Sequence, residues 1–297
     1  MIAVVGPTAA GKSALSIALA HALGGEVVNA DSMQLYRGMD IGTAKLTVDE
    51  REGVPHHVLD VWDVREPASV AAYQELARAA VDGILARGRV PLLVGGSGLY
   101  VRAVLEEFEF PGTDPAIRER LERELAAVGP APLHERLRTL DEPAATKILP
   151  SNGRRIVRAL EVIELTGAPF TASLPSPTPH YPSVQLGVDR EASSLDQRIA
   201  DRVDLMWAAG LLDEVRGLDG LREGRTASRA LGYQQALAQL DGEFTQEQAV
   251  DETVRATRRF VRRQRSWFRR DPRITWLDGA SPTLTEDALA ACAVAAR

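Results

Sequence analysis

The chain has 297 residues, of which 45% are hydrophobic and 26% charged, enough to bury one large core and a second, smaller one. It contains no apolar stretch of about 18 residues, so we expect no membrane-spanning helix. Its N-terminal segment lacks the charged start of a signal peptide, and Cys292 has no second cysteine to pair with. These features predict a reducing, cytoplasmic location. The net charge of −6 argues weakly against nucleic-acid binding.

The N-terminal segment predicts a phosphate-binding loop. Residues 2–5 read as a short buried strand, residues 6–13 (GPTAAGKS) match G-x-x-x-x-G-K-[ST], and residues 14–23 form an uninterrupted helical stretch. In this context backbone N–H groups turn toward one anion, Lys12 adds a point charge, and the Ser13 hydroxyl is a ligand for Mg²⁺. The predicted diphosphate-binding residues are Gly6, Pro7, Thr8, Ala9, Ala10, Gly11, Lys12 and Ser13.

Strand and helix patterns then alternate, which predicts an α/β fold with a parallel sheet of the P-loop NTPase type. We expect strands at residues 2–5, 26–30, 57–61 and 90–94, with a helix at 70–87. Further on we expect helices at 116–128, 133–140 and 153–166, a proline-rich connector, a strand at 184–188 and helices from about 195 to 270. Residues 1–112 and 184–297 therefore form the predicted core, the latter with a basic C-terminal helical region, and residues 113–183 a helical insertion that contacts RNA.

Six sequence blocks resemble those of the tRNA dimethylallyltransferases, also called tRNA isopentenyltransferases, of the bacterial type. The blocks are DSMQLYRGMDIGTAK at 31–45, LLVGGSGLY at 92–100, RRIVRALEV at 154–162, RIADR at 198–202, RALGY at 229–233 and RQRSWFR at 263–269. The resemblance implies an enzyme that transfers a dimethylallyl group from dimethylallyl diphosphate to the N6 amine of the adenosine 3′ of the anticodon. It also implies a partner, tRNA, that is held by its anticodon stem-loop, and we expect a monomer.

The implied chemistry matches particular residues. Asp31 follows the second strand, where ligands of open α/β sheets lie, and is the expected general base for the adenine amine; an acid at this place in other P-loop enzymes holds Mg²⁺ instead. Lys12 and Arg202 are expected to neutralise the leaving diphosphate together with Mg²⁺, with Arg198 a weaker candidate. Thr8, Gln34 and Ser97 are read as polar supports, although the family usually has threonine at the position of Ser97.

The resemblance also predicts an RNA-binding surface. The positions that match tRNA-contacting residues of the family are Asp31, Ser32, Met33, Gln34, Ser97, Arg118, Arg154, Arg155, Ile156, Val157, Arg158, Arg229, Gly232, Tyr233 and Gln234. The family often has a basic residue at the position of Gln234. Residues 253–273 carry nine arginines and one acid, and we expect Arg262 and Arg265 among them to contact phosphates. A solvated helix face is the alternative.

Other interpretations stay open at this point. A P-loop with an acid and arginines also describes small-molecule kinases, and the related adenylate isopentenyltransferases act on free nucleotide. A non-catalytic RNA-binding switch is a third alternative, although the chain lacks a guanine-reading N-K-x-D motif. His56 and His57 lack further ligands at metal-binding spacing and are read as core-edge residues. Asp60 and Asp63 resemble the Mg²⁺-binding acid of an ATPase, a role that the family does not use.

Overall fold

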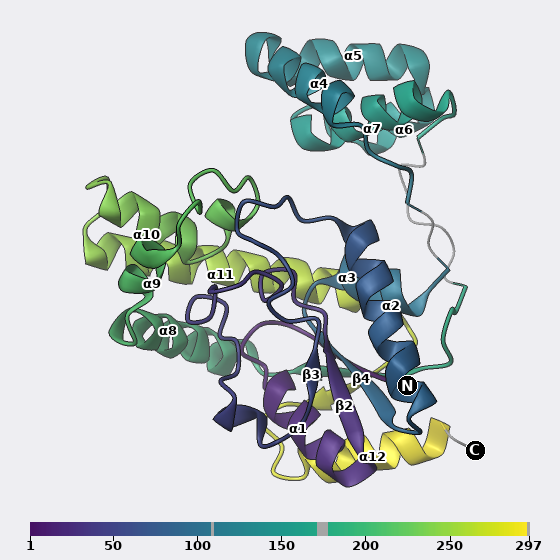
Figure 1. Cartoon of the computed structure of the whole chain (residues 1–297), viewed down its shortest axis with the longest axis vertical. Coiled ribbons are helices and arrows are strands. Elements are labelled where there is room, and N and C mark those ends of the chain that lie inside the picture. Colours follow the sequence, from purple (N-terminus) through teal and green to yellow (C-terminus); the bar gives the residue numbers. More distant parts are fainter. Residues whose placement is uncertain (108–109, 171–177, 296–297) are drawn as a thin grey trace. The chain divides into compact units, whose positions relative to one another are not determined.

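The computed structural model describes residues 1–107, 110–170 and 178–295 (Figure 1). Its internal contacts divide the chain into two compact units. Unit 1 comprises Met1–Glu106 and Pro179–Arg297, and unit 2 comprises Glu107–Thr178. The insertion predicted at residues 113–183 is shifted by a few residues toward the C-terminus relative to unit 2.

Unit 1 is built on a sheet of six parallel strands in the order β3-β2-β4-β1-β5-β6. This arrangement confirms the predicted α/β fold with a P-loop-like core. Because the strands are parallel, the loops after β1, β2, β4 and β5 all emerge at one edge of the sheet. The strands are β1 Ile2–Val5, β2 Gly25–Asn29, β3 His56–His57, β4 Val90–Gly95, β5 Val184–Asp189 and β6 Ile274–Asp278.

Helices cover both faces of this sheet, and the side chains of each strand alternate between them. Ile2 and Val4 belong to a core with α1 (Lys12–Leu23), α8 (Ala192–Ala208) and α12 (Leu284–Ala295). Ala3 and Val5 belong to the opposite core, with α2 (Val70–Ala86) and α3 (Gly98–Leu105). Of these helices, α1 and α12 contact each other and lie side by side in Figure 1.

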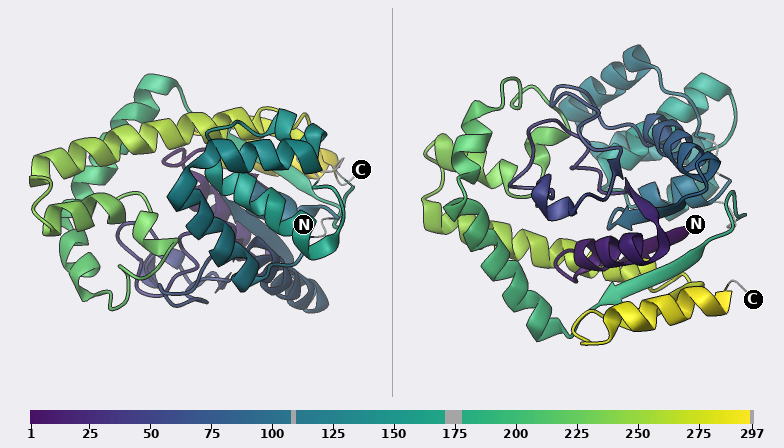
Figure 2. Two further views of the ribbon diagram at one scale, coloured as in Figure 1. Left: turned by 90° about the horizontal axis from the view of Figure 1, so that it is seen from above. Right: turned by 60° about the horizontal axis from the view of Figure 1, so that its bottom comes forward.

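The remaining helices of unit 1 gather beside the loop edge of the sheet. They are η1 Asp49–Arg51, α9 Leu211–Gly217, η2 Ala227–Arg229, α10 Tyr233–Leu240 and α11 Gln246–Phe268. The long helix α11 packs against α3, α8 and α10 (Figure 2). Its buried side is a stripe that includes Ala249, Thr253, Ala256, Val261 and Phe268, spaced as on one face of a helix.

Unit 2 is a four-helix unit with its own core. Its helices are α4 Pro115–Val128, α5 Pro130–Leu140, α6 Glu142–Lys147 and α7 Gly153–Thr166. Leu121, Leu133, Leu137 and Ile156 are buried at its centre. Glu161 is fully buried and accepts ion pairs from Arg118 at 2.5 Å and Arg158 at 2.9 Å, so the charge inside this small core is compensated.

Three sequence expectations differ from the structure. The strand predicted at 57–61 ends after His57, because Val58 and Asp60 have positive φ angles of 61° and 57° that take the chain out of the sheet. The sequence analysis does not predict β6, which is one of the two edge strands. The helical stretch from 195 to 270 is interrupted by loops. Within the described residues, no helix is both long and apolar enough to span a membrane.

Candidate active site

The loop at residues 6–13 joins β1 to the N-terminus of α1 and has the backbone of a phosphate-binding turn. Gly6 and Gly11 have φ angles of 134° and 113°, and Ala9 has 66°. A Cβ on Gly6 would overlap the Val188 carbonyl oxygen of β5, so only glycine fits there. Gly11, at the N-cap of α1, supplies no side-chain cap. The first N–H groups of α1 are therefore available to an anion.

A cavity of about 770 Å³ opens over this loop and lies wholly within unit 1; we call it the central cavity. Its walls come from the phosphate loop, the turn after β2, the end of β4, α8, η2 and α11. Asp31 therefore faces the same cavity as the phosphate loop, as its place after a strand predicts. The predicted residues that line it are Thr8, Ala9, Gly11, Lys12, Ser13, Asp31, Ser32, Met33, Gln34, Arg198, Arg202 and Arg229.

Lys12, Asp31 and Arg202 form an electrostatic group in this cavity. Burial lowers the pKa of Lys12 to about 8, with Asp31 acting in the opposite direction and Arg202 adding to the shift. Burial raises the pKa of Asp31 above its usual value, although Lys12 and Arg202 oppose that shift. Burial and Arg198 lower the pKa of Arg202, which stays charged. The group thus combines two cations suited to a phosphate with one carboxylate of raised basicity.

Asp31 is fixed by the turn that follows β2. Its Oδ1 accepts the backbone N–H of Met33 at 3.0 Å, and its own N–H is bonded to Asn29 Oδ1 at 2.9 Å. The backbone N–H of Ser32 donates to Ser97 Oγ at 3.2 Å, so the hydroxyl at position 97 connects the ends of β2 and β4. Ser97 itself is not among the residues that line the central cavity. Its predicted contact with tRNA stays a prediction.

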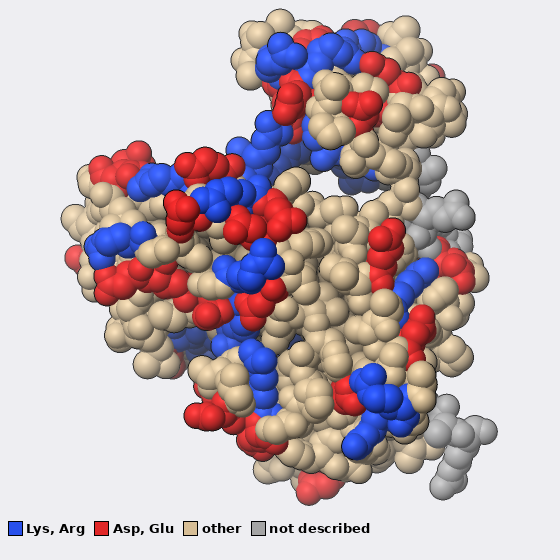
Figure 3. Space-filling view, in the orientation of Figure 1, with Lys and Arg blue, Asp and Glu red and all other residues tan. Residues whose placement is uncertain are grey.

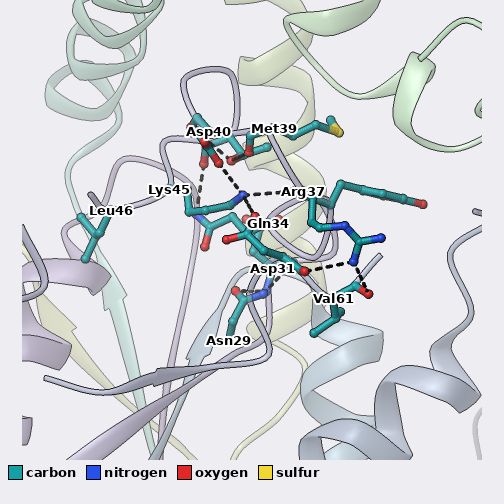
Figure 4. A network of polar contacts seen from close by, with 12 residues as sticks. Asn29, Asp31, Gln34, Arg37, Met39, Asp40, Lys45, Leu46 and Val61 are labelled. Atoms are coloured by element: carbon teal, nitrogen blue, oxygen red, sulfur yellow. Dashed lines mark hydrogen bonds and ion pairs between the residues drawn. The ribbon is translucent and has the colours of Figure 1, made fainter. Parts of the chain in front are cut away.

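Lys45 stabilises the loop that continues from this turn (Figure 4). Its side chain is only 3% exposed, and its ammonium contacts Asp40 Oδ1 at 2.6 Å, Asp60 Oδ1 at 2.5 Å and the Tyr36 carbonyl at 3.0 Å. Gln34 donates from Nε2 to the Thr43 carbonyl at 3.1 Å within the same loop. The loop at residues 31–45, which is a family block, is therefore held by hydrogen bonds between its own residues. Asp60 is a structural partner of Lys45.

Two arginines bind backbone carbonyls of the phosphate loop. Arg198 Nε donates to the Ala9 carbonyl at 2.9 Å, and Arg190 Nε donates to the Ala10 carbonyl at 3.0 Å. Arg202, four residues after Arg198 on the same face of α8, has no hydrogen bond or ion pair with any described residue. The two arginines predicted from the 198–202 block thus differ: Arg198 supports the loop, and Arg202 presents a free cation to the cavity.

Comparison with known proteins decides the family. A model of the family described as IPP transferase matches residues 34–271. The chain is 76% identical over 299 residues to a tRNA dimethylallyltransferase of Salinispora arenicola, covering all of this chain and 87% of that protein. It is 68% identical to one of Streptomyces avermitilis, covering 96% and 92%. The chain belongs to the IPP transferase family.

Solved structures of related enzymes have the same fold. The crystal structure of a full-length tRNA isopentenylpyrophosphate transferase from Bacillus halodurans superimposes with a TM-score of 0.73 at 42% identity, covering 99% of this chain and 95% of that one. A eukaryotic dimethylallyltransferase, described as acting on tRNA, gives a TM-score of 0.83 at 28% identity, covering 99% and 77%. These comparisons, which cover 99% of the chain, show that its fold is that of the family.

Unit 2 carries six of the residues that the family resemblance places at tRNA. Arg154 and Arg155 are exposed at the start of α7. Arg118 and Arg158 instead bind the buried Glu161, and Arg158 also donates to the Pro111 and Gly112 carbonyls. Ile156 and Val157 lie in the core of unit 2, so their side chains cannot contact RNA. Within this block, contact through exposed side chains is left to Arg154 and Arg155.

The predicted tRNA-contacting residues at 229–234 also include both exposed and buried side chains. Arg229 and Gln234 are exposed and line a second cavity, of about 740 Å³, beside α10 and α11. Tyr233 is buried, and its hydroxyl donates to Glu214, which also accepts the backbone N–H of Ile41 at 2.7 Å. A Cβ on Gly42 would overlap the Tyr233 ring. Tyr233 therefore supports the 31–45 loop, and its buried side chain is not open to tRNA, which corrects the expectation for that side chain. The predicted contact of the adjacent Gly232 stays a prediction.

The arginine-rich segment is less free than its sequence suggests. Six of its nine arginines form ion pairs with acids, most of them supplied by other parts of unit 1, and Figure 3 shows blue and red side chains interspersed over the side of unit 1 that carries α10. Arg265 donates twice to Asp189 Oδ1, at 2.9 and 2.7 Å. The expectation that Arg265 contacts phosphate is therefore corrected, whereas the exposed Arg262 has no hydrogen bond or ion pair with a described residue.

This difference gives a paired prediction. Arg262→Gln is expected to weaken tRNA binding and to flatten the dependence of log K on log salt by about 0.7–0.9, the value for one lost phosphate contact. Arg265→Gln is expected to leave that slope unchanged and to lower the free energy of unfolding by about 1.5–3 kcal/mol, because a largely buried carboxylate loses its charged donor. Titrations at several salt concentrations, with urea unfolding, test both. An equal slope for Arg262→Gln and the unsubstituted protein would contradict the first expectation.

The histidines and the remaining acids have structural partners. His57 Nε2 lies 2.6 Å from Glu26 Oε2, and His56 Nδ1 lies 2.8 Å from the Val54 carbonyl. Asp63 Oδ1 accepts the backbone N–H of Arg65 at 3.0 Å. Among the residues that the structure describes, no group of three or more histidine, cysteine, aspartate or glutamate side chains is arranged to hold a metal ion. The ATPase-like interpretation of Asp60 and Asp63 has no support here.

Sequence reasoning missed Gln264, Arg190 and Lys45. Each binds a functional loop from a distant part of the chain or from a buried position, so no local pattern reveals the role. The available signal for Gln264 was its place on the buried face of α11, where it is the residue with a side-chain amide among alanine, threonine, valine and phenylalanine. Buried polar side chains are normally hydrogen-bonded, so such a residue predicts a specific partner.

Proposed function

We propose that this chain transfers a dimethylallyl group from dimethylallyl diphosphate to the N6 amine of the adenosine 3′ of the anticodon in tRNA, releasing diphosphate. The observation that carries the proposal is the central cavity, in which a phosphate loop, the Asp31 carboxylate and the free Arg202 cation meet. Membership of the IPP transferase family and the high identity to tRNA dimethylallyltransferases support the same reaction.

The residues divide the chemistry between them. The adenine amine is a poor nucleophile because its lone pair is delocalised into the ring, so a base must accept its proton as the N–C bond forms. Asp31 takes that proton, and its raised pKa makes it a stronger base than an exposed aspartate. The bond between the allylic carbon and the diphosphate oxygen breaks, and Lys12, Arg202 and the N–H groups at the start of α1 stabilise the charge that develops on diphosphate.

Mg²⁺ is the cofactor that we propose. Ser13 and Asp31 both line the central cavity and offer oxygen atoms, the donor type that Mg²⁺ prefers, and this ion commonly keeps several waters and uses one or two protein ligands with substrate phosphates. Ser13 is the residue that would hold it. When bound, the ion would add positive charge next to the diphosphate.

The acceptor must leave its stack to enter the cavity, which costs a few kcal/mol. We propose that Ser32, Met33, Gln34 and Arg229 meet the extruded base and its neighbours, and that Arg154 and Arg155 of unit 2 meet the rest of the anticodon stem-loop. We also propose a cytoplasmic location, which suits a tRNA-modifying enzyme, and we keep the expectation of a monomer.

The two alternatives predict different products. A small-molecule kinase would cleave a γ-phosphate and yield ADP, and an adenylate isopentenyltransferase would accept AMP. Arg154 and Arg155 of α7 are exposed and are not among the residues that line the central cavity, so they have no role toward a small acceptor there and favour tRNA. Nucleotides are expected to bind the phosphate loop weakly and to compete with the donor, because its N–H groups and Lys12 recognise linked phosphates in general.

Incubation of the protein with labelled dimethylallyl diphosphate and Mg²⁺, with unmodified tRNA or AMP as acceptor, tests the proposal. We expect prenylated tRNA and diphosphate in equal amounts, no product with AMP, and no ADP when ATP is added. The tRNA in which the adenosine next to the anticodon is replaced by guanosine is the matched control and should give no product. ADP in stoichiometric amounts without prenylated adenosine would rule the transferase out.

A further inference from the structure

Gln264 of α11 is a buried polar side chain whose amide is used at both ends. It is 4% exposed. Its Oε1 accepts the backbone N–H of Thr8 at 3.0 Å, and its Nε2 donates to the Gly96 carbonyl at 3.0 Å. A donor on one side and an acceptor on the other fix the orientation of the amide. Gln264 thus joins the phosphate loop to the turn after β4, two segments far from it in sequence.

The turn after β4 is shaped to admit this side chain. A Cβ on Gly96 would overlap the Gln264 side-chain nitrogen, and a Cβ on Gly98 would overlap the indole of Trp267, one turn further along α11. Both glycines are therefore required for the close approach of α11. The result is a well-defined place for one amide, between the ends of β1 and β4.

The bond to Thr8 affects the phosphate loop directly. Because the Thr8 N–H already donates to Gln264, it is not available to an anion, and the loop must bind phosphate with the N–H groups that follow. Arg198 and Arg190 hold the Ala9 and Ala10 carbonyls. Three consecutive residues of the loop, 8 to 10, are thus each held by one side chain, and Gln264 is the uncharged member of that set.

α11 also lines the central cavity with Thr253, Thr257, Phe260 and Arg263. Arg263 is next to Gln264 in sequence, and it lines the second cavity as well. The same helix therefore contributes to the walls that face an acceptor and holds the loop that faces a donor. A shift of α11 would move the Thr8 amide with it, because protein interiors are close-packed.

We propose that Gln264 is a positioning residue that holds the phosphate loop in the geometry needed to bind a diphosphate. The proposal builds on the proposed function for the identity of the donor, but it concerns diphosphate affinity and is tested with inorganic pyrophosphate alone. Gln264→Met keeps the length of the side chain and removes both hydrogen bonds. Gln264→Glu keeps an oxygen that accepts from Thr8. Gln246→Met, at an exposed position on the same helix, is the matched control.

Calorimetric titration with pyrophosphate and Mg²⁺ is expected to give a Kd at least tenfold higher for Gln264→Met, an intermediate value for Gln264→Glu, and an unchanged value for Gln246→Met. In steady state, KM for the prenyl diphosphate should rise by a similar factor while KM for tRNA stays within about threefold. A purely structural role would lower the melting temperature and the active fraction without changing either KM of the folded enzyme.

A pyrophosphate Kd for Gln264→Met within twofold of the unsubstituted protein would overturn the proposal. If that variant does not fold, Gln264→Glu decides it: a Kd equal to that of the unsubstituted protein, with the donation to Gly96 lost, would show that the bridge does not set the loop. If the unsubstituted protein binds pyrophosphate but prenylates no tRNA, the proposed function fails while the titrations still decide the role of Gln264.

Discussion

Asp31→Asn is expected to lower turnover by a factor of about 10² or more while leaving tRNA binding within a few-fold, because it removes the proton acceptor and little else. The asparagine oxygen can still accept the Met33 N–H that Asp31 Oδ1 accepts at 3.0 Å, so the turn after β2 should keep its shape. Single-turnover transfer from preformed complex measures the chemical step. A wild-type rate in that assay would show that Asp31 is not the base.

Removal of this carboxylate should also change the donor site in a defined direction. Asp31 attracts Lys12 and Arg202, so its loss leaves two cations without their anion. Pyrophosphate should then bind as tightly as before or more tightly. A variant that fails in chemistry yet keeps its diphosphate affinity separates a base from a binding residue. If Asp31 instead held Mg²⁺, the affinity for Mg²⁺-pyrophosphate would fall together with turnover.

The acid side of the pH profile follows from the same residue. A general base must be deprotonated, so kcat/KM falls as the pH falls through the pKa of Asp31 in the free enzyme. Because burial raises that pKa, the loss should begin at a higher pH than an ordinary aspartate would give. The Asp31→Asn variant should lack this acid limb in its residual activity.

The sequence predicts the donor side of the site well because that side is local. A strand, a glycine-rich turn and a helix start are contiguous, and the rule that ligands lie at the carboxyl ends of parallel strands adds Asp31. Arg202 follows from a motif. The structure confirms that these residues share one cavity. Their roles in catalysis remain predictions to be measured.

The rest depends on contacts between distant segments. The charge of the arginine segment is counted correctly from the sequence. Asp189 at the end of β5 and Asp196 on α8 nevertheless neutralise part of it. Ile156 and Val157 match a family block, but the helical position of each directs it into the core of unit 2. Val58 is a residue type that is common in strands, but its positive φ angle ends β3 early. None of these outcomes follows from a single segment.

Gln264 illustrates the same limit at the site itself. Its partners, Thr8 and Gly96, are 256 and 168 residues away in sequence. Only the packing of α11 over the loop edge of the sheet brings the three together. The block at residues 263–269 indicates the family, but it does not predict that Gln264 bonds to Thr8 and Gly96.

Lys12→Met is the second substitution from which we expect a large effect, a loss of about 10²–10³ in turnover, because one positioned charge beside the leaving diphosphate disappears. The ammonium of Lys12 donates to the Pro7 carbonyl at 2.7 Å, so the melting temperature of the variant has to be compared first. Arg198→Gln, which removes a support of the loop and leaves the cations of Lys12 and Arg202 in place, is the comparison and should lose less.

The pH dependence of Lys12 makes this prediction specific. Burial lowers its pKa to about 8, so in the free enzyme the cation is present at neutral pH and is lost as the pH rises through 8. An ordinary lysine would keep its charge to about pH 10. Pyrophosphate affinity and kcat/KM for the donor should therefore decline above about pH 8. Bound diphosphate favours the charged lysine, so the alkaline limb of kcat should lie at higher pH than that of kcat/KM.

The ligand also titrates, and Lys12→Met separates the two effects because it retains only the titration of pyrophosphate. The ratio of the Kd of Lys12→Met to that of the unsubstituted protein should be large and constant near pH 7 and should shrink as the pH rises above 8. Calorimetry from pH 6.5 to 9.5 measures it. If the Kd of the variant and that of the unsubstituted protein change with pH in parallel over this range, Lys12 keeps its proton throughout. Burial would then not lower the pKa of Lys12 into this range.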